Sequence, residues 1–191
     1  MSIKSFLILL FAKSIRKYIH RYSKNAVADQ ERILKELIQK AKHSRFGKDH
    51  NFNDIRSYQD FVRNVPIRDY EGLKNYFDKI THGENDILWP GKPKYLAKTS
   101  GTTSGVKYIP ITSDSVPNHI GSARNAILNY IAEKNDASIF KGKMIFLSGS
   151  PELESKGGIP TGRLSGIVNH EVPAWIRGNQ LPSLTTNCID D

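Results

Sequence analysis

Residues 95–111 read YLAKTSGTTSGVKYIPI, in which two short stretches of apolar and aromatic residues flank a loop of glycine, serine and threonine. The flanking stretches 95–97 and 108–111 have the composition of β-strands, so the segment predicts strand, loop and strand. Small residues leave the backbone N–H groups of the loop open to a ligand, and its hydroxyl and ammonium groups add donors and positive charge. The loop therefore suits a polyphosphate, although a plain flexible connection between strands has the same composition. The side chains that we expect to contact phosphate are those of Ser100, Thr102, Thr103 and Lys107.

This loop does not follow the two familiar nucleotide-binding patterns. A Walker loop needs glycine, four residues and then Gly-Lys-Ser/Thr at the start of a helix, whereas Val106 stands five places after Gly101. The sequence contains no G-x-G-x-x-G pattern either. Kinase, GTPase and dinucleotide-binding functions therefore have no support from this loop.

The residues after the loop predict an alternation of helix and strand. A helix is expected to begin at Thr112 or Ser113, to carry Pro117 in its first turn and to run to about Lys134. Residues 144–147 (MIFL) form a short apolar run typical of a strand that is buried on both faces. Because strands alternate with a helix in this region, the sequence predicts the α/β fold class. The last 35 or so residues show no clear periodicity.

Toward the N-terminus the pattern is helical. Apolar residues recur every three or four positions in residues 3–23 and again in residues 29–42, which predicts two helices. Gly47 is expected to end the second helix. Ser57 followed by Asp60 resembles a capping box at the start of a short helix, which Pro66 ends. Another helix is expected over residues 69–80, and residues 82–94 have the composition of a loop.

The excess of positive charge lies in the N-terminal quarter of the chain. The 191 residues include 28 Lys and Arg and 19 Asp and Glu, and residues 1–48 hold twelve of the former and three of the latter. We expect residues 1–48 to be basic helices that pack on the body, with a solvated face or with a contact to an anionic membrane surface. The apolar run at residues 5–12 is too short to span a membrane, and no nucleic-acid partner is expected.

Cysteine and histidine residues give no sign of a disulfide or a metal site. Cys188 is the single cysteine, so the sequence excludes a disulfide scaffold and favours a cytoplasmic protein. The six histidines have no ligand spacing to one another or to this cysteine, and no resident metal is expected. No pair of a nucleophile and a base can be identified, so the catalytic residues stay unknown.

The stretch TSGTTSGVK followed by YIPIT resembles the phosphate loop of adenylate-forming enzymes, the superfamily of acyl-CoA synthetases, adenylation domains and luciferases. It is more closely similar to the form of this loop in the auxin-responsive promoter (Gretchen Hagen) family of acyl-acid amido synthetases. Four flanking segments resemble bacterial members of that family, and together they extend the resemblance over nearly the whole chain. They are FGKDHNF (46–52), YQDFVRNVPIRDYEGLKNYF (58–77), ILWPGKPKYLAKTSGTT (87–103) and GGIPTGRLSGI (157–167).

The resemblance implies a ligase that works in two steps. ATP and a small carboxylic acid give an acyl-adenylate and pyrophosphate, and an amine, typically that of an amino acid, then displaces AMP to form an amide. Mg²⁺ would arrive with the nucleotide. By match to the family's motif, the contacts to the ATP phosphates are Ser100, Gly101, Thr102, Thr103, Gly105 and Lys107.

Two further implications concern the loop path and the acyl pocket. The usual superfamily loop has glycine directly after the second threonine and proline before the lysine, whereas this chain has Ser104 and Val106 at those positions. Lys107 nevertheless keeps its offset from Gly101. By analogy the helix after Ile111 lines part of the acyl pocket, where Arg124 is the candidate to face the carboxylate of the acid.

Members of the resembled family are well over twice as long as this chain. Residues 49–191 are therefore expected to be an incomplete large domain of the adenylate-forming type, in an N-terminal portion that is inactive alone. The alternative from another functional class is a non-catalytic module that binds an anionic surface or a protein partner through its basic N-terminal helices.

Overall fold

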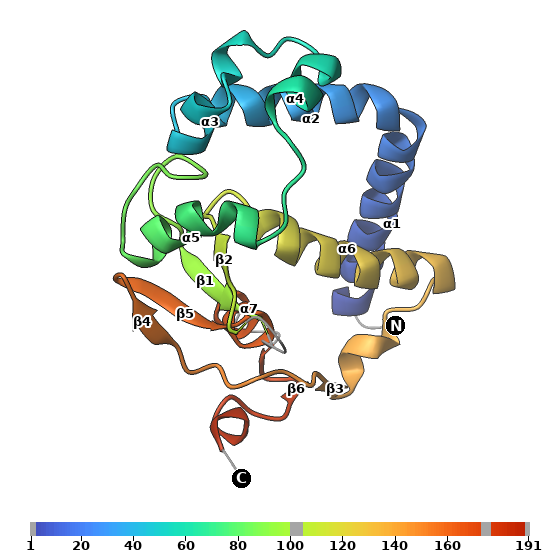
Figure 1. Cartoon of the computed structure of the whole chain (residues 1–191). Coiled ribbons are helices and arrows are strands. Elements are labelled where there is room, and N and C mark those ends of the chain that lie inside the picture. Colours follow the sequence, from blue (N-terminus) through green and yellow to red (C-terminus); the bar gives the residue numbers. More distant parts are fainter. Residues whose placement is uncertain (1–2, 100–104, 173–176, 190–191) are drawn as a thin grey trace. The chain divides into compact units, whose positions relative to one another are not determined.

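The computed structural model describes residues 3–99, 105–172 and 177–189 (Figure 1), and the chain forms two compact units. The first unit comprises Met1–Ala26, Asp114–Glu152 and Ser165–Asp191, and the second comprises Val27–Ser113 and Leu153–Leu164. Both helices and strands are present, so the predicted α/β class agrees with the observed mixture of helix and sheet.

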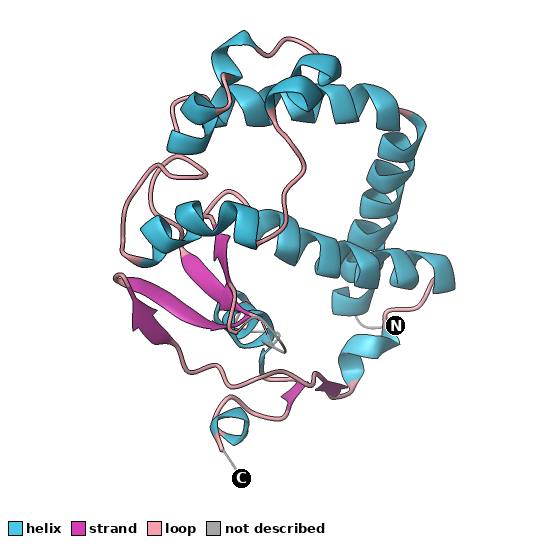
Figure 2. Cartoon of the chain, viewed as in Figure 1, coloured by secondary structure: helices cyan, strands magenta, loops and turns pink. Residues whose placement is uncertain are grey.

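A four-stranded sheet organises the second unit, with the strands in the order β2-β1-β5-β4. β1 pairs with β2 in the antiparallel sense and with β5 in the parallel sense, and β4 pairs with β5 as an antiparallel hairpin. The central strand β1 is buried at its first three residues, as expected of a strand with a neighbour on each side. Figure 2 shows these strands in magenta, and their bounds are β1 (Tyr95–Lys98), β2 (Tyr108–Ile111), β4 (Glu154–Lys156) and β5 (Ile159–Arg163).

Short helices complete the second unit. Ile80, at the end of α5, packs with Leu96 of β1 and Ile159 of β5 in one apolar cluster, which joins this helix to the sheet. A second apolar cluster, built around Ile38 and Phe52, holds the preceding helices together. The helices are α2 (Ala26–Ala41), α3 (Arg45–Asp49), α4 (Tyr58–Asn64) and α5 (Lys74–Thr81), with short 3-10 turns η1 (Phe52–Asp54) and η2 (Glu71–Leu73).

The first unit is built on two long helices that pack against each other, α1 (Ile3–Lys24) and α6 (Val116–Lys134). Leu9 and Ala12 of α1 are buried against Leu128 and Ile131 of α6. An ion pair between Arg16 and Glu133, 2.5 Å apart, adds a polar contact at the edge of this interface. The other elements are η3 (Ser138–Lys141), β3 (Met144–Ile145) parallel to β6 (Gln180–Leu181), α7 (Leu164–Glu171, which enters from the second unit) and η4 (Thr186–Cys188).

The local predictions are largely confirmed. The helix predicted over residues 3–23, the strands on either side of the loop and the capping box of Ser57 and Asp60 are all present. The helix predicted over residues 69–80 is present as η2 followed by α5. Its acidic start acts as a cap, because the backbone N–H of Gly72 donates to Oδ1 of Asp69 at 2.8 Å.

Three predictions were wrong. Gly47 does not end a helix but lies inside α3, where a Cβ atom would collide with the backbone carbonyl of Ala41. α6 begins at Val116 and not at Thr112 or Ser113, because Pro117 fixes the first turn and the preceding residues form a separate turn. The apolar run 144–147 is not buried on both faces: Ile145 of β3 is 76% exposed, since β3 pairs with β6 in a sheet of two strands.

The turn between β4 and β5 explains why two consecutive glycines are needed there. Gly157 and Gly158 have φ angles of 58° and 70°, which is the conformation that a two-residue hairpin turn requires. A Cβ atom on Gly157 would lie 2.5 Å from the carbonyl oxygen of Thr81 and 2.7 Å from the nitrogen of Gly83. On Gly158 it would meet only the mobile end of Lys92, at 3.1 Å.

Gly157→Ala is therefore expected to destabilise the protein much more than Gly158→Ala. Both variants carry the cost of a positive φ angle, about 1 kcal/mol. Gly157→Ala adds a collision with backbone atoms at the end of α5, worth about 2 kcal/mol more. Urea unfolding of the two variants measures the difference directly, and equal destabilisation would contradict the close packing of this turn.

The capping box at the start of α4 makes a local, pH-dependent contribution to stability. The Ser57 hydroxyl and the backbone N–H groups of Arg56 and Ser57 all donate to Oδ2 of Asp60, and Arg63 pairs with the other carboxylate oxygen. The hydrogen bond from Ser57, followed by those from Arg56 and Arg63, lowers the pKa of Asp60 from 3.8 to about 2.

Asp60→Asn is expected to lower the melting temperature at neutral pH and to have a smaller effect in acid. Because the folded pKa is depressed, the stabilisation is present above the ordinary pKa and is lost as the pH falls through about 2. Melting curves of the wild type and the variant between neutral pH and about pH 2 check this, with Asp54→Asn as the control. A difference in melting temperature that does not change with pH would rule out the carboxylate as its source.

Candidate functional site

The glycine-rich loop leaves the carboxyl end of the buried strand β1 and returns as β2. Lys98 and Tyr108 are paired across the two strands, and the backbone N–H of Thr99 donates to the carbonyl of Lys107 at 3.0 Å. The loop is therefore closed at its base by a regular antiparallel ladder. Of the predicted phosphate contacts, Ser100, Gly101, Thr102 and Thr103 lie outside the described residues.

Gly105 and Lys107 are the predicted contacts that the structure describes. Gly105 has a φ angle of 78°, a conformation that glycine adopts without strain, and no atom of the described residues lies within 4 Å of the place where a Cβ would stand. The backbone at Gly105 thus faces open space, as a loop that admits a ligand requires. Lys107 follows two residues later and directly precedes β2.

Lys107 is held over the ring of Tyr70. Its Nζ atom lies 5.2 Å from the ring centroid, within the range of a cation–π interaction. Tyr70 in turn accepts a hydrogen bond from the backbone N–H of Tyr108 at 3.1 Å and stacks on Phe77 at a centroid distance of 4.6 Å. This aromatic support orients the ammonium group beside the base of the loop.

A second parallel strand ends beside the same loop. Lys98, the last residue of β1, is in register with Arg163, the last residue of β5. Lys98 Nζ donates to Oε2 of Glu154 at 2.6 Å, whereas Arg163 is exposed. The carboxyl ends of two neighbouring parallel strands therefore place positive side chains at one edge of the sheet, which is the edge where open α/β sheets bind ligands.

A further lysine, paired across the β4–β5 hairpin with the first residue of β5, lies over an aromatic residue of β2. Lys156 of β4 lies with its Nζ atom 4.3 Å from the ring centroid of Tyr108, the residue that follows Lys107. The edge itself combines small loop residues, the lysine that lies over Tyr70 and an exposed arginine. This combination is suited to holding a polyphosphate by charge and backbone hydrogen bonds.

Sequence reasoning missed several of these residues. Tyr70 and Arg163 lie in segments that resemble the family, yet neither has a local pattern that links it to the loop. Arg163 is brought to Lys98 by the parallel pairing of β1 with β5, which are more than 60 positions apart in the sequence. For Arg163, the one available signal was its place after the glycine pair 157–158 and directly before a helix.

Arg124 lies in the first unit, on α6, whereas the loop belongs to the second unit. Its guanidinium group is exposed and donates from Nε and Nη2 to Oδ1 of Asn125, at 3.2 and 3.1 Å. It lines an open pocket of about 470 Å³ together with Tyr18 of α1 and Pro117. Its assignment to the carboxylate of an acid stays a prediction.

The described residues hold neither a metal-binding cluster nor a membrane-spanning helix. They contain no group of three or more His, Cys, Asp or Glu side chains that could hold a metal ion. Within the same part of the chain, no helix combines the length and the apolar character that crossing a membrane demands.

Comparison with known proteins gives a family match over most of the chain. The model of the GH3 family N-terminal domain matches residues 15–189. Indole-3-acetic acid-amido synthetase GH3.15 of Arabidopsis thaliana is 30% identical over 141 residues, which are 69% of this chain and 23% of that protein. Jasmonoyl-L-amino acid synthetase JAR6 of Nicotiana attenuata is 24% identical over 143 residues, which are 73% of this chain and 24% of that protein.

A solved structure has the same fold. It is described as the AtGH3.15 acyl acid amido synthetase in complex with 2,4-DB, and it superimposes on 94% of this chain with a TM-score of 0.75. The sequence identity is 22%, and the matched part is 32% of that chain, so the similarity concerns the fold of the N-terminal part.

The chain spans about a quarter of the length of the curated relatives that it matches. Every segment on which the family resemblance was based, from residue 46 to residue 167, lies within the matched range. The likeness to bacterial members in particular stays a prediction. The family itself is confirmed: this chain belongs to the GH3 family of acyl acid amido synthetases, and the part of the family that it matches is the N-terminal domain.

Proposed function

We propose that the protein containing this chain is an ATP-dependent acyl-acid amido synthetase that adenylates a small carboxylic acid and transfers the acyl group to an amine. The observation that carries the proposal is the glycine-rich, cationic loop at the carboxyl end of β1, in a chain of the GH3 family. The proposal applies to a protein of the relatives' length. The 191 residues alone, which span about a quarter of that length, are expected to be inactive.

In the first step an oxygen of the acid's carboxylate attacks the α-phosphorus of ATP. The bond from this phosphorus to the bridging oxygen breaks, and pyrophosphate leaves with the electron pair. We propose that the ATP phosphates are contacted by the following residues: the backbone and side chains of Ser100, Gly101, Thr102 and Thr103, the backbone of Gly105, and Lys107. Donors fixed in place before the reaction stabilise the charge that develops on the leaving pyrophosphate.

The described part of the loop fits this role in shape and charge. The open space at Gly105 lets the backbone approach a phosphate, and the ammonium group of Lys107 is positioned by Tyr70 without a carboxylate within ion-pairing distance among the described residues. Mg²⁺, bound with the nucleotide, would neutralise further negative charge on the phosphates. Arg163, exposed beside Lys98, is available to the same anion.

In the second step the nitrogen of the amine attacks the acyl carbon. The bond between this carbon and the oxygen of AMP breaks, AMP leaves with an oxygen of the original carboxylate, and the amine loses a proton. We propose an amino acid as the amine, because the relatives carry the names of an indole-3-acetic acid-amido synthetase and a jasmonoyl-L-amino acid synthetase. Arg124 is our candidate for a contact to the acid, and the cytoplasm is the proposed location.

Product analysis of the full-length protein tests this proposal. The protein is incubated with ATP, Mg²⁺, a panel of carboxylic acids that includes indole-3-acetic acid and jasmonic acid, and a mixture of amino acids. We expect AMP, pyrophosphate and an amide in equal amounts, each dependent on both the acid and ATP. Formation of ADP and inorganic phosphate with the amide would contradict adenylation and indicate an acyl-phosphate mechanism.

The non-catalytic alternative, a module that binds an anionic surface through the basic N-terminal helices, is favoured by one observation on α1. This helix exposes apolar and basic residues in the first unit. Such a surface is compatible with an enzyme and does not exclude the catalytic function.

A further inference from the structure

Helix α1 has two apolar faces, and α6 covers only one of them. The covered face contains Leu9 and Ala12, which are buried in the cluster shared with α6. The other face contains five large apolar residues in the first three turns, each between 49% and 82% exposed. They are Ile3, Phe6, Leu7, Leu10 and Phe11.

The exposed residues form a continuous stripe. Positions 3, 7 and 10 recur at the spacing of one helix face, and position 6 lies on the same side. Scattered apolar residues on a surface need no explanation, but a contiguous stripe of this kind marks a contact surface. Figure 1 shows α1 in blue, where it crosses α6, the helix that it contacts.

Positive charge follows directly after the apolar stripe. α1 contains six Lys and Arg residues and no Asp or Glu, and five of the six lie at or after position 13. Lys17, His20 and Ser23 line a shallow groove of about 400 Å³ beside Asn129 of α6. Arg16 also lines this groove and pairs with Glu133.

The apolar stripe precedes the part of the chain that the family model describes. The GH3 match begins at residue 15, so the exposed residues of the first three turns lie outside it. Of the five basic residues that follow, Lys13 also lies outside the match and the other four lie inside it. This boundary separates the stripe from the elements on which the amido synthetase proposal is based.

From these observations we propose that α1 docks the protein on an anionic lipid surface as a peripheral contact. The apolar stripe enters the boundary between head groups and acyl chains, and the basic turns lie over lipid phosphates. Charge complementarity favours an anionic lipid surface as the partner, because a helix with six cations and no carboxylate attracts negative charge. A helix that lies in the interface in this way does not need the length of a membrane span.

The inference goes beyond the proposed enzyme activity and does not depend on it. Docking through α1 uses residues of the first unit, whereas the phosphate loop belongs to the second. Vesicle binding and amide synthesis can therefore fail independently, and one assay does not decide the other.

Co-sedimentation of the full-length protein with vesicles tests the inference. The probes are vesicles of phosphatidylcholine alone and of phosphatidylcholine mixed with phosphatidylserine. We expect the protein to bind the mixed vesicles, and high salt to weaken this binding through screening. L7Q/L10Q removes exposed apolar surface and is expected to weaken the binding about tenfold or more.

A charge variant of α1 and two matched controls show whether vesicle binding depends on this helix. K13Q/K17Q is expected to weaken binding to the mixed vesicles by roughly tenfold, since neither lysine is in the buried interface. V62Q/I67Q removes two exposed apolar residues elsewhere, and K35Q/K48Q removes two exposed lysines elsewhere. Both controls are expected to bind like the wild type.

The inference is overturned if the wild type does not sediment with mixed vesicles or if K13Q/K17Q and L7Q/L10Q bind as tightly as their controls. Thermal melts show whether a variant is folded. If L7Q/L10Q lowers the melting temperature while K13Q/K17Q keeps its vesicle affinity, the stripe is a contact within the full-length protein, and the lipid docking is wrong.

Discussion

Replacing Lys107 with alanine in the full-length protein is expected to slow acid-dependent exchange of pyrophosphate into ATP by about a hundredfold or more. Its ammonium group lies beside the base of the loop, 5.2 Å from the ring centroid of Tyr70. From there it can stabilise the charge that develops on the leaving pyrophosphate. Because that charge is larger in the transition state than in bound ATP, the loss is expected mainly in kcat.

Two comparisons make this result specific. Lys107→Arg keeps a cation that can stack on Tyr70 and is expected to retain much of the exchange rate. Lys35→Ala removes an exposed lysine from α2, far along the chain from the loop, and is expected to leave the rate unchanged. If Lys107→Ala exchanges pyrophosphate at the rate of Lys35→Ala, Lys107 is a solvated lysine and has no part in the reaction.

The second large effect is expected from Thr102→Ala combined with Thr103→Ala. The family resemblance assigns both hydroxyl groups to the phosphates, and removing two donors to one anion should abolish measurable exchange. The same variant should still sediment with anionic vesicles like the wild type, because α1 is unchanged. Measuring both properties on one preparation separates loss of the site from loss of the fold.

Thr99→Ala is the matched control for this variant. Thr99 belongs to the same loop, but it forms its hydrogen bond through the backbone, whose N–H donates to the carbonyl of Lys107. The side chain is exposed, so its removal should change the exchange rate little. An equal loss in Thr99→Ala would mean that the loop is sensitive to any substitution, and the assignment of Thr102 and Thr103 would lose its support.

The features that could be predicted are those that residues close together in the sequence determine. The strands β1 and β2 were predicted because a few apolar residues on each side of the loop are enough to identify a hairpin-like pair. The capping box needs only Ser57 and Asp60 three residues apart, and it is present as predicted. For α1, the periodicity of its apolar residues over six turns left little ambiguity.

Features that depend on distant residues could not be predicted. Arg163 reaches the loop through the parallel register of β5 with β1, and the support of Lys107 by Tyr70 joins residues 37 positions apart. Neither of these two contacts produces a periodic pattern of residues in the sequence. The run MIFL at 144–147 was predicted to be a buried strand because its residues are apolar. In the structure Ile145 is 76% exposed in a two-stranded sheet.

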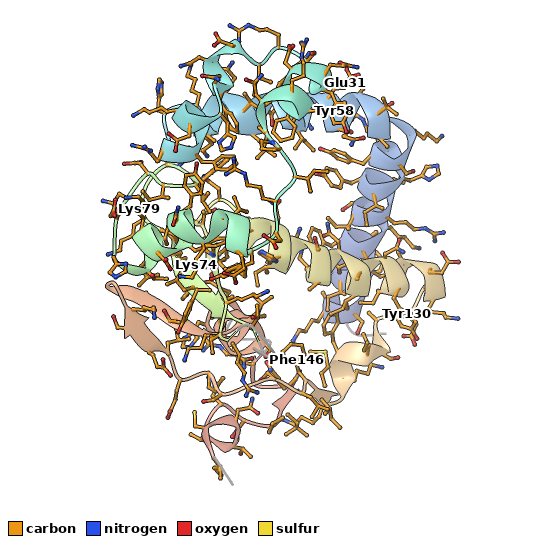
Figure 3. The ribbon with its side chains drawn as sticks, viewed as in Figure 1. Glu31, Tyr58, Lys74, Lys79, Tyr130 and Phe146 are labelled. Atoms are coloured by element: carbon orange, nitrogen blue, oxygen red, sulfur yellow. The ribbon has the colours of Figure 1, made fainter. Side chains whose placement is uncertain are left out.

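The position of functional side chains follows from the sheet more than from the loop itself. β1 is fixed by β2 on one side and by β5 on the other, so the loop leaves a rigid strand end. Figure 3 shows the side chains of this unit as sticks, with Lys74 and Lys79 labelled on α5, the helix that packs on the sheet. A rigid support of this kind is what a loop needs to hold donors in place before a charged transition state forms.

The most direct test of the central claim follows the oxygen atoms of the acid. The full-length protein is given ATP, an amino acid and a carboxylic acid labelled with oxygen-18 in both carboxylate positions. If the acid is activated as an acyl-adenylate, AMP carries one oxygen-18 atom for each amide formed, and the pyrophosphate carries none. Label in inorganic phosphate, or amide formation that leaves AMP unlabelled, would contradict adenylation by this protein.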